Sequence, residues 1–454
     1  MKITVLNGSP AGKDSITLQT MLYIKKFHPE CTLEILHVGQ KIRSIEKDFG
    51  ACEKALREAD LLVFCYPVYT FLVPAQLHRF LELIKERRVD VSGKFATQIS
   101  TSKHFYDSTA HRFIQDNCED LGLRYIRGLS ADMEDLLSKK GRREALDFFR
   151  FVLWSMENDC AEKPVAFGSG RAKKASAASL CEKNTEDKKF SVAIVTDLSA
   201  DADGRLRAMI DRFRNRIPGT TEVVDLAEFP FSGGCLGCFH CAADGKCIYK
   251  DGFDDYLRGN IQTCDAIVYA YTIRDHSMGY RFKLYDDRQF CNGHRTVTMG
   301  KPVGYLVDGD LDREDNLKTL MHARAQVGGN FLAGVACDCG DPDREIDRLA
   351  KTLVFAIENE YQPPADFYGV GGMKIFRDLI YTMQGMMRAD HRFYREHGFY
   401  NDYPQKHKGK IAAMYLVGAM MTNKKLSKKI GSRMTEGMLM PYKSVMDKAD
   451  SEKE

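Results

Sequence analysis

The sequence predicts an α/β protein built from two consecutive doubly wound parallel sheets, followed by a helical C-terminal extension. Short apolar segments alternate with segments of helical periodicity, which is typical of parallel strands joined by crossover helices. This alternation occurs twice along the chain. Small and charged residues without periodicity separate the two copies, as expected for a linker.

The first copy contains five predicted strands and ends on a helix over about residues 142–156. The strands are predicted at 2–7, 31–37, 60–66, 95–100 and 123–129. The third strand reads DLLVFCY and is apolar enough to be buried on both faces of a sheet. We therefore predict a first domain over residues 1–159.

The second copy follows a linker predicted over residues 160–189 and forms a domain predicted over 190–360. Its strands are predicted at 190–197, 221–226, 266–271, 302–308 and 331–337, before a helix over about 343–358. Equivalent segments indicate an insertion of 16 residues between the second and third strands of this copy.

Residues 361–454 fit neither copy and are predicted to form the helical extension. Their early part is rich in Phe and Tyr and contains an apolar stripe at helical spacing. The stripe consists of Phe376, Leu379, Ile380, Met383 and Met387. We expect it to pack on the two domains or on a second subunit; covering a bound flavin or substrate is the alternative.

Composition excludes several classes of protein. The chain has 454 residues, with 66 Lys and Arg against 63 Asp and Glu, so it is neither a polybasic nucleic-acid binder nor an acidic tail protein. The longest apolar run, Ile411–Met421, is shorter than the roughly 18 residues of a membrane span. The first residues, MKITVLNGSP, predict a strand entering a loop, not a secretion signal. Fourteen cysteines without such a signal indicate reduced thiols in the cytoplasm.

The loop after the first strand has the composition of an anion site. It reads NGSPAGKDSIT over residues 7–17, where small hydroxylated residues enter a helix whose N-terminus favours negative charge. The candidate phosphate-binding residues are Ser9, Pro10, Lys13, Ser15 and Thr17. An ordinary capped strand-to-helix turn is the alternative. Neither a P-loop nor a dinucleotide glycine motif occurs in the sequence.

The loop after the third strand supplies a wall for a flat aromatic cofactor. Its candidate residues are Pro67, Val68, Tyr69, Thr70 and Phe71. In a sheet of order 2-1-3-4-5, strands one and three meet at the switch point where ligand crevices form. Both loops are therefore expected to face one crevice.

In these two loops the sequence resembles the flavodoxin-like NADPH-dependent FMN reductases. Their approximate patterns are G-S-P-R-x-x-S-N-T after strand one and S-P-V-Y-x-x-x-x-P-A-x-L-K after strand three. The matching residues are Gly8, Ser9, Pro10, Ser15, Thr17, Pro67, Val68, Tyr69, Pro74, Ala75 and Leu77. Ala11 and Ile16 replace the usual Arg and Asn, and Lys13 can compensate. The resemblance implies two flavodoxin-like domains, non-covalently bound FMN, and Ser100, Thr101 and His104 along the flavin edge.

The equivalent loops of the second copy have lost this pattern. The first of them carries Asp197 and Asp201, whose carboxylates would repel a phosphate. The second reads YTIRD over residues 271–275, where the first copy has YPVYT. We therefore expect one FMN in each chain, bound by the first domain.

Four closely spaced cysteines lie in the insertion: Cys235, Cys238, Cys241 and Cys247. Thiolates this close repel one another and need a shared cation or cluster. Zinc sites usually consist of two separated pairs, so the continuous triplet favours iron–sulfur; zinc and redox-active thiols are the alternatives. The motif resembles that of the iron–sulfur flavoproteins, including acidic residues after it at 251, 254 and 255. This resemblance implies a [4Fe–4S] cluster.

Together these patterns predict a flavoprotein oxidoreductase of the NAD(P)H-dependent FMN reductase type. FMN would receive electrons from NAD(P)H or another low-potential donor and exchange them with the cluster, and then with an unknown acceptor. No residue is assigned as a general acid or base. An electron carrier without a small-molecule substrate, and a zinc-stabilised binding protein without flavin, are the alternatives. Related reductases commonly dimerise across the flavin edge, so a homo-oligomer is possible; we expect a pseudo-dimer within one chain.

Overall fold

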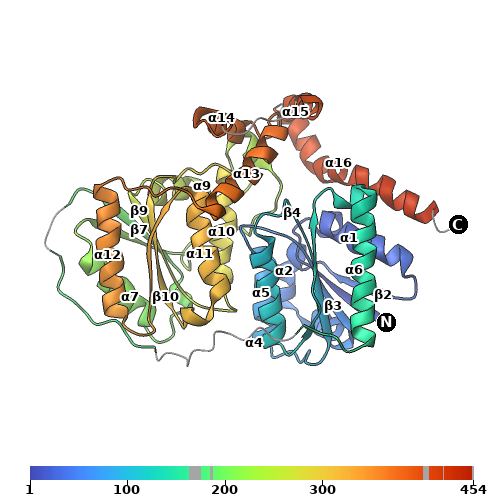
Figure 1. The fold of residues 1–454 in the computed structure, drawn as a ribbon, viewed down its shortest axis with the longest axis horizontal. Helices are drawn as coiled ribbons and strands as arrows, with labels where there is room; N and C mark the ends of the chain where they lie inside the picture. The colour runs from blue at the N-terminus through green and yellow to red at the C-terminus, as the bar shows by residue number, and fades with distance from the viewer. Residues whose placement is uncertain (163–174, 185–187, 402–407, 423, 452–454) are drawn as a thin grey trace. The chain divides into compact units, whose positions relative to one another are not determined.

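In this computed structural model the described residues are 1–162, 175–184, 188–401, 408–422 and 424–451. Contacts between Cα atoms divide the chain into two compact units, each built around one sheet (Figure 1). The first unit comprises 1–165, 234–238 and 423–454, and the second comprises 166–233 and 239–422. Parts of the predicted linker, 163–174 and 185–187, lie outside the described residues.

The first sheet has the predicted doubly wound order. Its strands are β1 (Lys2–Asn7), β2 (Thr32–Leu36), β3 (Leu61–Pro67), β4 (Phe95–Ser102), β5 (Arg124–Tyr125) and β6 (Leu129–Asp132). They run in the order β2-β1-β3-β4-β5, with β6 also paired to β4, and every pairing is parallel. Residues 61–66 of β3 are fully buried, so the prediction of burial on both faces is confirmed.

The fifth predicted strand is in fact two short ones, β5 and β6. Gly128 lies between them, close against the neighbouring strand β4. A Cβ at this position would lie 2.5 Å from the carbonyl oxygen of Gln98, so only glycine permits the approach. The break therefore depends on a contact between strands that a local apolar pattern does not contain.

Helices cover both faces of the first sheet. They are α1 (Ile16–Phe27), α2 (Val38–Lys47), α3 (Gly50–Glu58), α4 (Ala75–Glu86), α5 (Asp107–Asp120) and α6 (Lys139–Glu157). On one face, apolar residues of α1 and α6 close over the strands and include Leu18, Phe149 and Val152. The C-terminal helix α16 (Lys424–Ser451) joins this unit through Tyr442 and Val445, which pack on Tyr23 of α1.

The second sheet repeats the topology of the first. Its strands are β7 (Ser191–Thr196), β8 (Thr220–Asp225), β9 (Ala266–Thr272), β10 (Pro302–Asp308) and β11 (Phe331–Cys337). Their order is β8-β7-β9-β10-β11, which is again 2-1-3-4-5. The predicted α/β class with two flavodoxin-like sheets is therefore confirmed.

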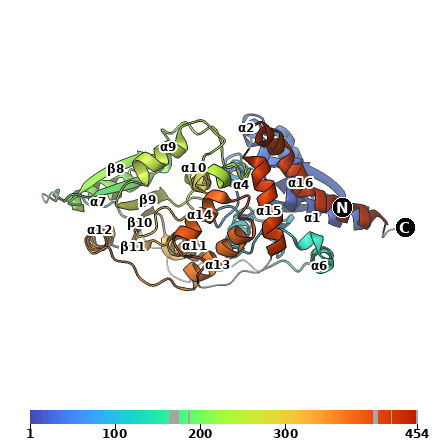
Figure 2. The same ribbon diagram turned by 90° about the horizontal axis from the view of Figure 1, so that it is seen from above.

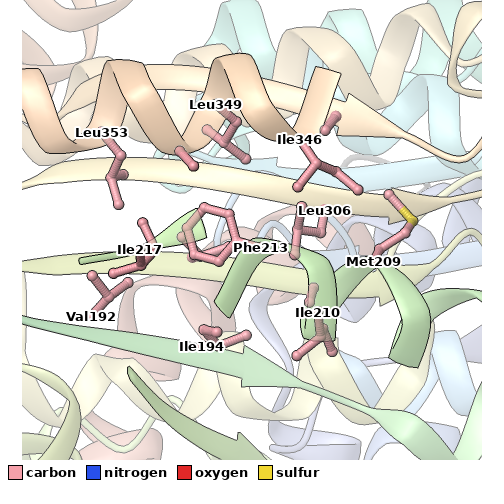
Figure 3. Packing of buried hydrophobic residues seen from close by; sticks show 14 of the residues in the cluster. Val192, Ile194, Met209, Ile210, Phe213, Ile217, Leu306, Ile346, Leu349 and Leu353 are labelled. Atoms are coloured by element: carbon pink, nitrogen blue, oxygen red, sulfur yellow. The ribbon is translucent and has the colours of Figure 1, made fainter. Parts of the chain in front are cut away.

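The helices of this unit divide between the two faces of its sheet. They are α7 (Arg205–Arg216), α10 (Tyr280–Arg288), α11 (Asp315–Gly328) and α12 (Pro342–Glu358). Figure 1 shows α7 and α12 on one face and α10 and α11 on the other. Phe213 of α7 lies at the centre of the core, with Leu306 of β10 and Leu349 of α12 around it (Figure 3).

The insertion and the extension add further helices. The insertion contains α8 (His240–Asp244) and α9 (Phe253–Tyr256), and the extension begins with α13 (Phe367–Thr382), α14 (Arg388–Glu396) and α15 (Lys408–Met421) (Figure 2). The predicted stripe of α13 and the turn after it packs with Tyr394 of α14. Contacts group α13–α15 with the second unit and α16 with the first, so the segment predicted as one extension, 361–454, is divided between units. The domain boundaries themselves stay a prediction.

Among the described helices, none combines the length and the apolar character that crossing a membrane requires.

We predict that Phe213→Ala lowers the free energy of unfolding by about 3–5 kcal/mol, because it leaves a cavity in a close-packed core. Phe355→Ala on α12 is the matched control, since that side chain is 53% exposed whereas Phe213 is completely buried. The control should change the free energy of unfolding by less than about 1 kcal/mol. Urea denaturation measures both; equal losses would contradict this account of the core.

Candidate flavin and cysteine site

The predicted flavin loops meet at one edge of the first sheet. Parallel strands end on the same side, and the register places Asn7 beside Cys65 and Pro67 beside Thr101. Ser100 in turn pairs with Ser130 at the end of β6. The loops after β1, β3, β4 and β6 are therefore neighbours, as ligand sites in this topology require.

The loop after β1 is held in shape by its own hydrogen bonds. The Nδ2 atom of Asn7 donates to the Gly12 carbonyl at 2.6 Å, and the Ser9 Oγ accepts from the Ala11 amide at 3.3 Å. Gly39 of α2 packs directly on this loop, because a Cβ there would overlap the carbonyl of Gly8. The shape of the predicted anion loop is thus fixed by the chain itself.

This loop fits a phosphate at the start of α1. Ser15 caps the helix by accepting from the Leu18 amide at 3.3 Å, and the first-turn amides of an α-helix have no partner within the helix. Ser9, Pro10 and Ser15 are buried, and Lys13 is exposed. The positive end of the helix dipole, the serine hydroxyl groups and Lys13 together form a suitable environment for negative charge.

Thr17 takes a different position from the other predicted phosphate residues. It is fully buried, and its hydroxyl lies 2.5 Å from the Thr101 hydroxyl of β4. This bond joins α1 to the strand that carries the predicted flavin edge. The geometry gives both threonines a role in fixing the two loops to each other.

The loop after β3 contains a strained tight turn. Tyr69 and Leu72 exchange backbone hydrogen bonds of 2.8 and 2.9 Å, while Thr70 and Phe71 adopt positive φ values of 43° and 69°. Side chains other than Gly, Asn or Asp rarely adopt this conformation, which costs about 1–3 kcal/mol per residue and is common at ligand sites. Pro67 and Val68 lead into the turn and are half-buried.

Aromatic rings gather behind this turn. The ring centroid of Phe71 lies 5.1 Å from that of Phe105 and 4.5 Å from that of Tyr106, both from the loop after β4. Thr109 fixes the arrangement by donating its hydroxyl to the Phe71 carbonyl at 2.5 Å. Sequence reasoning missed Phe105 and Tyr106, although two adjacent aromatic residues after the fourth strand were the available signal.

A polar network lies along the predicted flavin edge. Ser100 Oγ lies 2.7 Å from Nε2 of His111, and His104 Nδ1 lies 3.0 Å from Asp107, which also accepts from Ser130. Burial lowers the pKa of His111 to about 4, against the attraction of Asp107, so this imidazole is neutral near pH 7. His111 and Asp107 carried no recognisable sequence signal.

A cavity of about 380 Å³ opens beside this network. His104 and Ser130 line it together with Thr20 of α1 and Lys140 and Glu144 of α6. It therefore lies between the flavin-edge residues and the helices on one face of the sheet.

The first two cysteines of the motif pack on the loop after β3. Contacts place Gly234–Cys238 in the first unit, where Gln76 Nε2 donates to the Cys235 carbonyl at 3.4 Å. Gly237 has a φ of 61°, and a Cβ there would overlap the Tyr69 hydroxyl. A Cβ at Gly234 would lie 2.8 Å from Gln76 Nε2. The two glycines thus allow this cysteine turn to lie directly against the predicted flavin wall.

The other two cysteines belong to the second unit. Cys241 Sγ donates to the Phe290 carbonyl at 2.8 Å, and the Cys247 amide donates to Asp254 at 3.2 Å. The structure describes each pair by itself, so the set of four ligands stays a prediction. Within the first pair, the Gly237 amide points at Cys235 Sγ at 3.5 Å, a contact that stabilises a thiolate ligand.

Arg288 fixes the base of the cysteine loop and was missed by sequence reasoning. Its guanidinium donates to both carboxylate oxygens of Asp251 at 2.8 Å and to the Gly233 carbonyl at 2.9 Å. Burial acts to raise the pKa of Asp251, but the bonds from Arg288 and from the Ser232 amide lower it to about 2. One acidic residue of the predicted motif is therefore a structural anchor.

Most other cysteines are buried and unsuited to bind metal. Burial raises the pKa of Cys52 to about 11 and that of Cys291 to about 12, and it raises the pKa of Cys65 and Cys118 further. A thiol that resists deprotonation is a poor ligand. The four motif cysteines are all partly exposed, which suits a ligand set.

The second sheet retains the backbone conformation of the turn that follows its third strand. At the start of its first helix, however, a carboxylate lies where the first copy has the predicted anion loop. Arg274 and Ser277 exchange backbone bonds of 2.9 Å around Asp275 and His276, which repeat the positive φ values of the first copy. At the start of α7, however, the Asp201 carboxylate accepts from the amides of Leu206 and Arg207 at 3.1 and 3.0 Å. A carboxylate of the chain therefore occupies the place that a phosphate would need.

Comparison with known proteins finds similarity to one family and to several individual proteins. Residues 1–113 match the model of the NADPH-dependent FMN reductase family. The chain is 25% identical over 174 residues to an iron–sulfur flavoprotein of Archaeoglobus fulgidus, an alignment that covers 36% of this chain and 79% of that protein. It is 22% identical over 139 residues to an iron–sulfur flavoprotein of Clostridioides difficile, covering 29% of this chain and 61% of that one.

Among solved structures, the flavoenzyme NAD(P)H:(acceptor) oxidoreductase FerB of Paracoccus denitrificans is 15% identical, with a TM-score of 0.29 over 36% of this chain and 99% of that one. We assign the fold from the strand order and not from this likeness. Over its first 113 residues the chain is similar to the NADPH-dependent FMN reductase family, and it is also similar to the two iron–sulfur flavoproteins.

Proposed function

We propose that this chain is an NAD(P)H-dependent flavin oxidoreductase that binds one FMN and one [4Fe–4S] cluster. The observation that carries the proposal is the packing of the Cys235–Cys238 turn against Tyr69, because it brings half of the cysteine motif to the loop that matches the FMN reductase pattern. The cytoplasmic location stays a prediction.

The first unit offers a place for each part of FMN. The phosphate would bind Ser9, Ser15, Lys13 and the first amides of α1, with Pro10 shaping the loop. The residues from Pro67 to Phe71 would form the wall for the ring system. Ser100, Thr101 and His104 would lie along its edge, and Thr17 would hold α1 against Thr101.

The proposed reaction links a donor that gives up two electrons at once to later steps that transfer one electron at a time. NAD(P)H loses a hydride, which carries two electrons, and FMN supplies the ability to accept it and to release the electrons singly. Cys235, Cys238, Cys241 and Cys247 would hold the [4Fe–4S] cluster, which would supply one-electron exchange with an acceptor outside the chain. The protein residues would position the groups, and burial keeps His111 neutral near pH 7.

The test is the cofactor content of protein purified without oxygen. We expect one FMN with about four iron and about four sulfide per chain. Changing any of Cys235, Cys238, Cys241 or Cys247 to Ser should remove the visible iron–sulfur absorption and leave FMN bound. Cys160→Ser, at an exposed cysteine outside the motif, is the control and should retain full iron. Zinc without sulfide, or full iron in Cys241→Ser, would contradict the cluster.

The phosphate assignment predicts the effect of removing two hydroxyl groups. Ser9→Ala combined with Ser15→Ala should weaken FMN binding by about 2 kcal/mol, roughly 30-fold in Kd, at about 1 kcal/mol per hydrogen bond. Ser199→Ala, in the equivalent loop of the second unit, is the control and should leave the Kd unchanged. Fluorescence titration of apoprotein with FMN measures both. An unchanged Kd in the double variant would place the phosphate elsewhere.

The contact between the cysteine turn and the flavin wall predicts a steric effect. Gly237→Ala should displace the turn or Tyr69, and should reduce both iron content and FMN affinity. Gly204→Ala is the control, because Gly204 has a similar φ of 71° but no atom near its missing Cβ. Adding Tyr69→Phe to Gly237→Ala removes the clashing hydroxyl and should restore part of the loss. If both glycine variants behave alike, backbone strain and not the contact with Tyr69 is responsible.

A further inference from the structure

Helix α15 exposes large apolar side chains and buries its smallest residue. Leu416 is 66% exposed, Tyr415 49% and Met420 39%, whereas Gly418 is buried. Helices of globular proteins normally show the reverse pattern, with large apolar residues facing the core. We therefore expect another surface to bind the outward face of α15.

Packing within the second unit explains which face of α15 is turned inward. Gly418 lies directly on the turn after α13, because a Cβ there would overlap the Gly385 carbonyl, and a Cβ at Gly385 would overlap the backbone at Met414. The Tyr415 hydroxyl donates to Gln384 at 3.0 Å and holds the same crossing. Glycine at both positions lets the helices approach closely, and the larger apolar residues remain on the outside.

The sequence around α15 is strongly basic. Between Asp402 and Glu436 there are eight Lys and Arg residues and no Asp or Glu, although the whole chain carries a net charge of only +3. Lys408 and Lys410 precede the apolar stretch within α15, and Lys424 and Lys425 open α16. An apolar helix flanked in the sequence by positively charged residues has the composition of a segment that binds the surface of an anionic membrane.

Two properties favour a membrane surface over other binding partners for the exposed face of α15. The 14 residues of α15 span about 21 Å, less than the roughly 30 Å of a bilayer core, so the helix can lie on a membrane but not cross it. A second copy of the chain would place two equally basic segments side by side in an isologous contact, where they repel. The charge therefore favours an anionic partner over a second copy.

We propose that α15 is a membrane-surface anchor that inserts its apolar face among the lipids of an anionic bilayer. The exposed apolar side chains of α15 supply the buried area, and the basic residues on both sides of them supply attraction to the lipid headgroups. This inference goes beyond the proposed redox function and does not depend on it.

The test is flotation of the full-length protein with lipid vesicles. We expect binding to vesicles made of equal parts of phosphatidylglycerol and phosphatidylcholine, and much weaker binding to phosphatidylcholine alone. Raising the salt from about 0.1 M to about 1 M shortens the screening length from about 10 Å to about 3 Å and should reduce binding. Leu416→Glu should lower the partition coefficient about tenfold or more.

Leu180→Glu is the matched control, because Leu180 is 82% exposed and lies outside α15. It should bind vesicles like the unmodified chain, and circular dichroism shows whether either variant has lost its fold. Absence of binding to anionic vesicles, or equal binding by Leu416→Glu, overturns the proposal. A dimer that Leu416→Glu dissociates, measured by light scattering without lipid, identifies a second copy as the cover instead.

Discussion

The proposed chemistry depends on one close approach, between the backbone at Gly237 and the hydroxyl of Tyr69. There is no room for a side chain between them, so the cysteine turn lies directly against the loop after β3. That loop is itself fixed by a tight turn with positive φ at Thr70 and Phe71 and by the aromatic rings behind it. Backbone strain is common at ligand sites, where the surrounding fold stabilises the strained conformation and offsets its free-energy cost.

The two copies of the fold differ in the charge at one helix terminus. At the start of α1, the helix is capped by the neutral hydroxyl of Ser15. At the start of α7, the Asp201 carboxylate already accepts hydrogen bonds from the first amides. This difference supports the proposal of one anion site, at the start of α1. The second copy instead carries the insertion with the cysteines, anchored by the ion pair between Arg288 and Asp251.

The sequence was sufficient to predict the strand order, because buried parallel strands and their apolar periodicity are local patterns. The assignment of the loops to a flavin site stays a prediction. Features that depend on distant contacts were not predictable in this way. The break at Gly128 requires the backbone of β4, and Arg288 becomes an anchor only when α10 lies beside Asp251. The return of α16 to the first unit depends on packing of Tyr442 near Tyr23. The division of the four cysteines between two units was likewise not visible in their close spacing along the chain.

The central proposal is that FMN and a [4Fe–4S] cluster exchange electrons within one chain. The most direct measurement is the microwave power saturation of the flavin radical signal, recorded by electron paramagnetic resonance in partly reduced protein. A nearby paramagnetic cluster accelerates relaxation of the radical, so we expect a signal that is difficult to saturate, and one that saturates easily in Cys247→Ser. Identical saturation in the two proteins, with the cluster present in the first, would contradict the account.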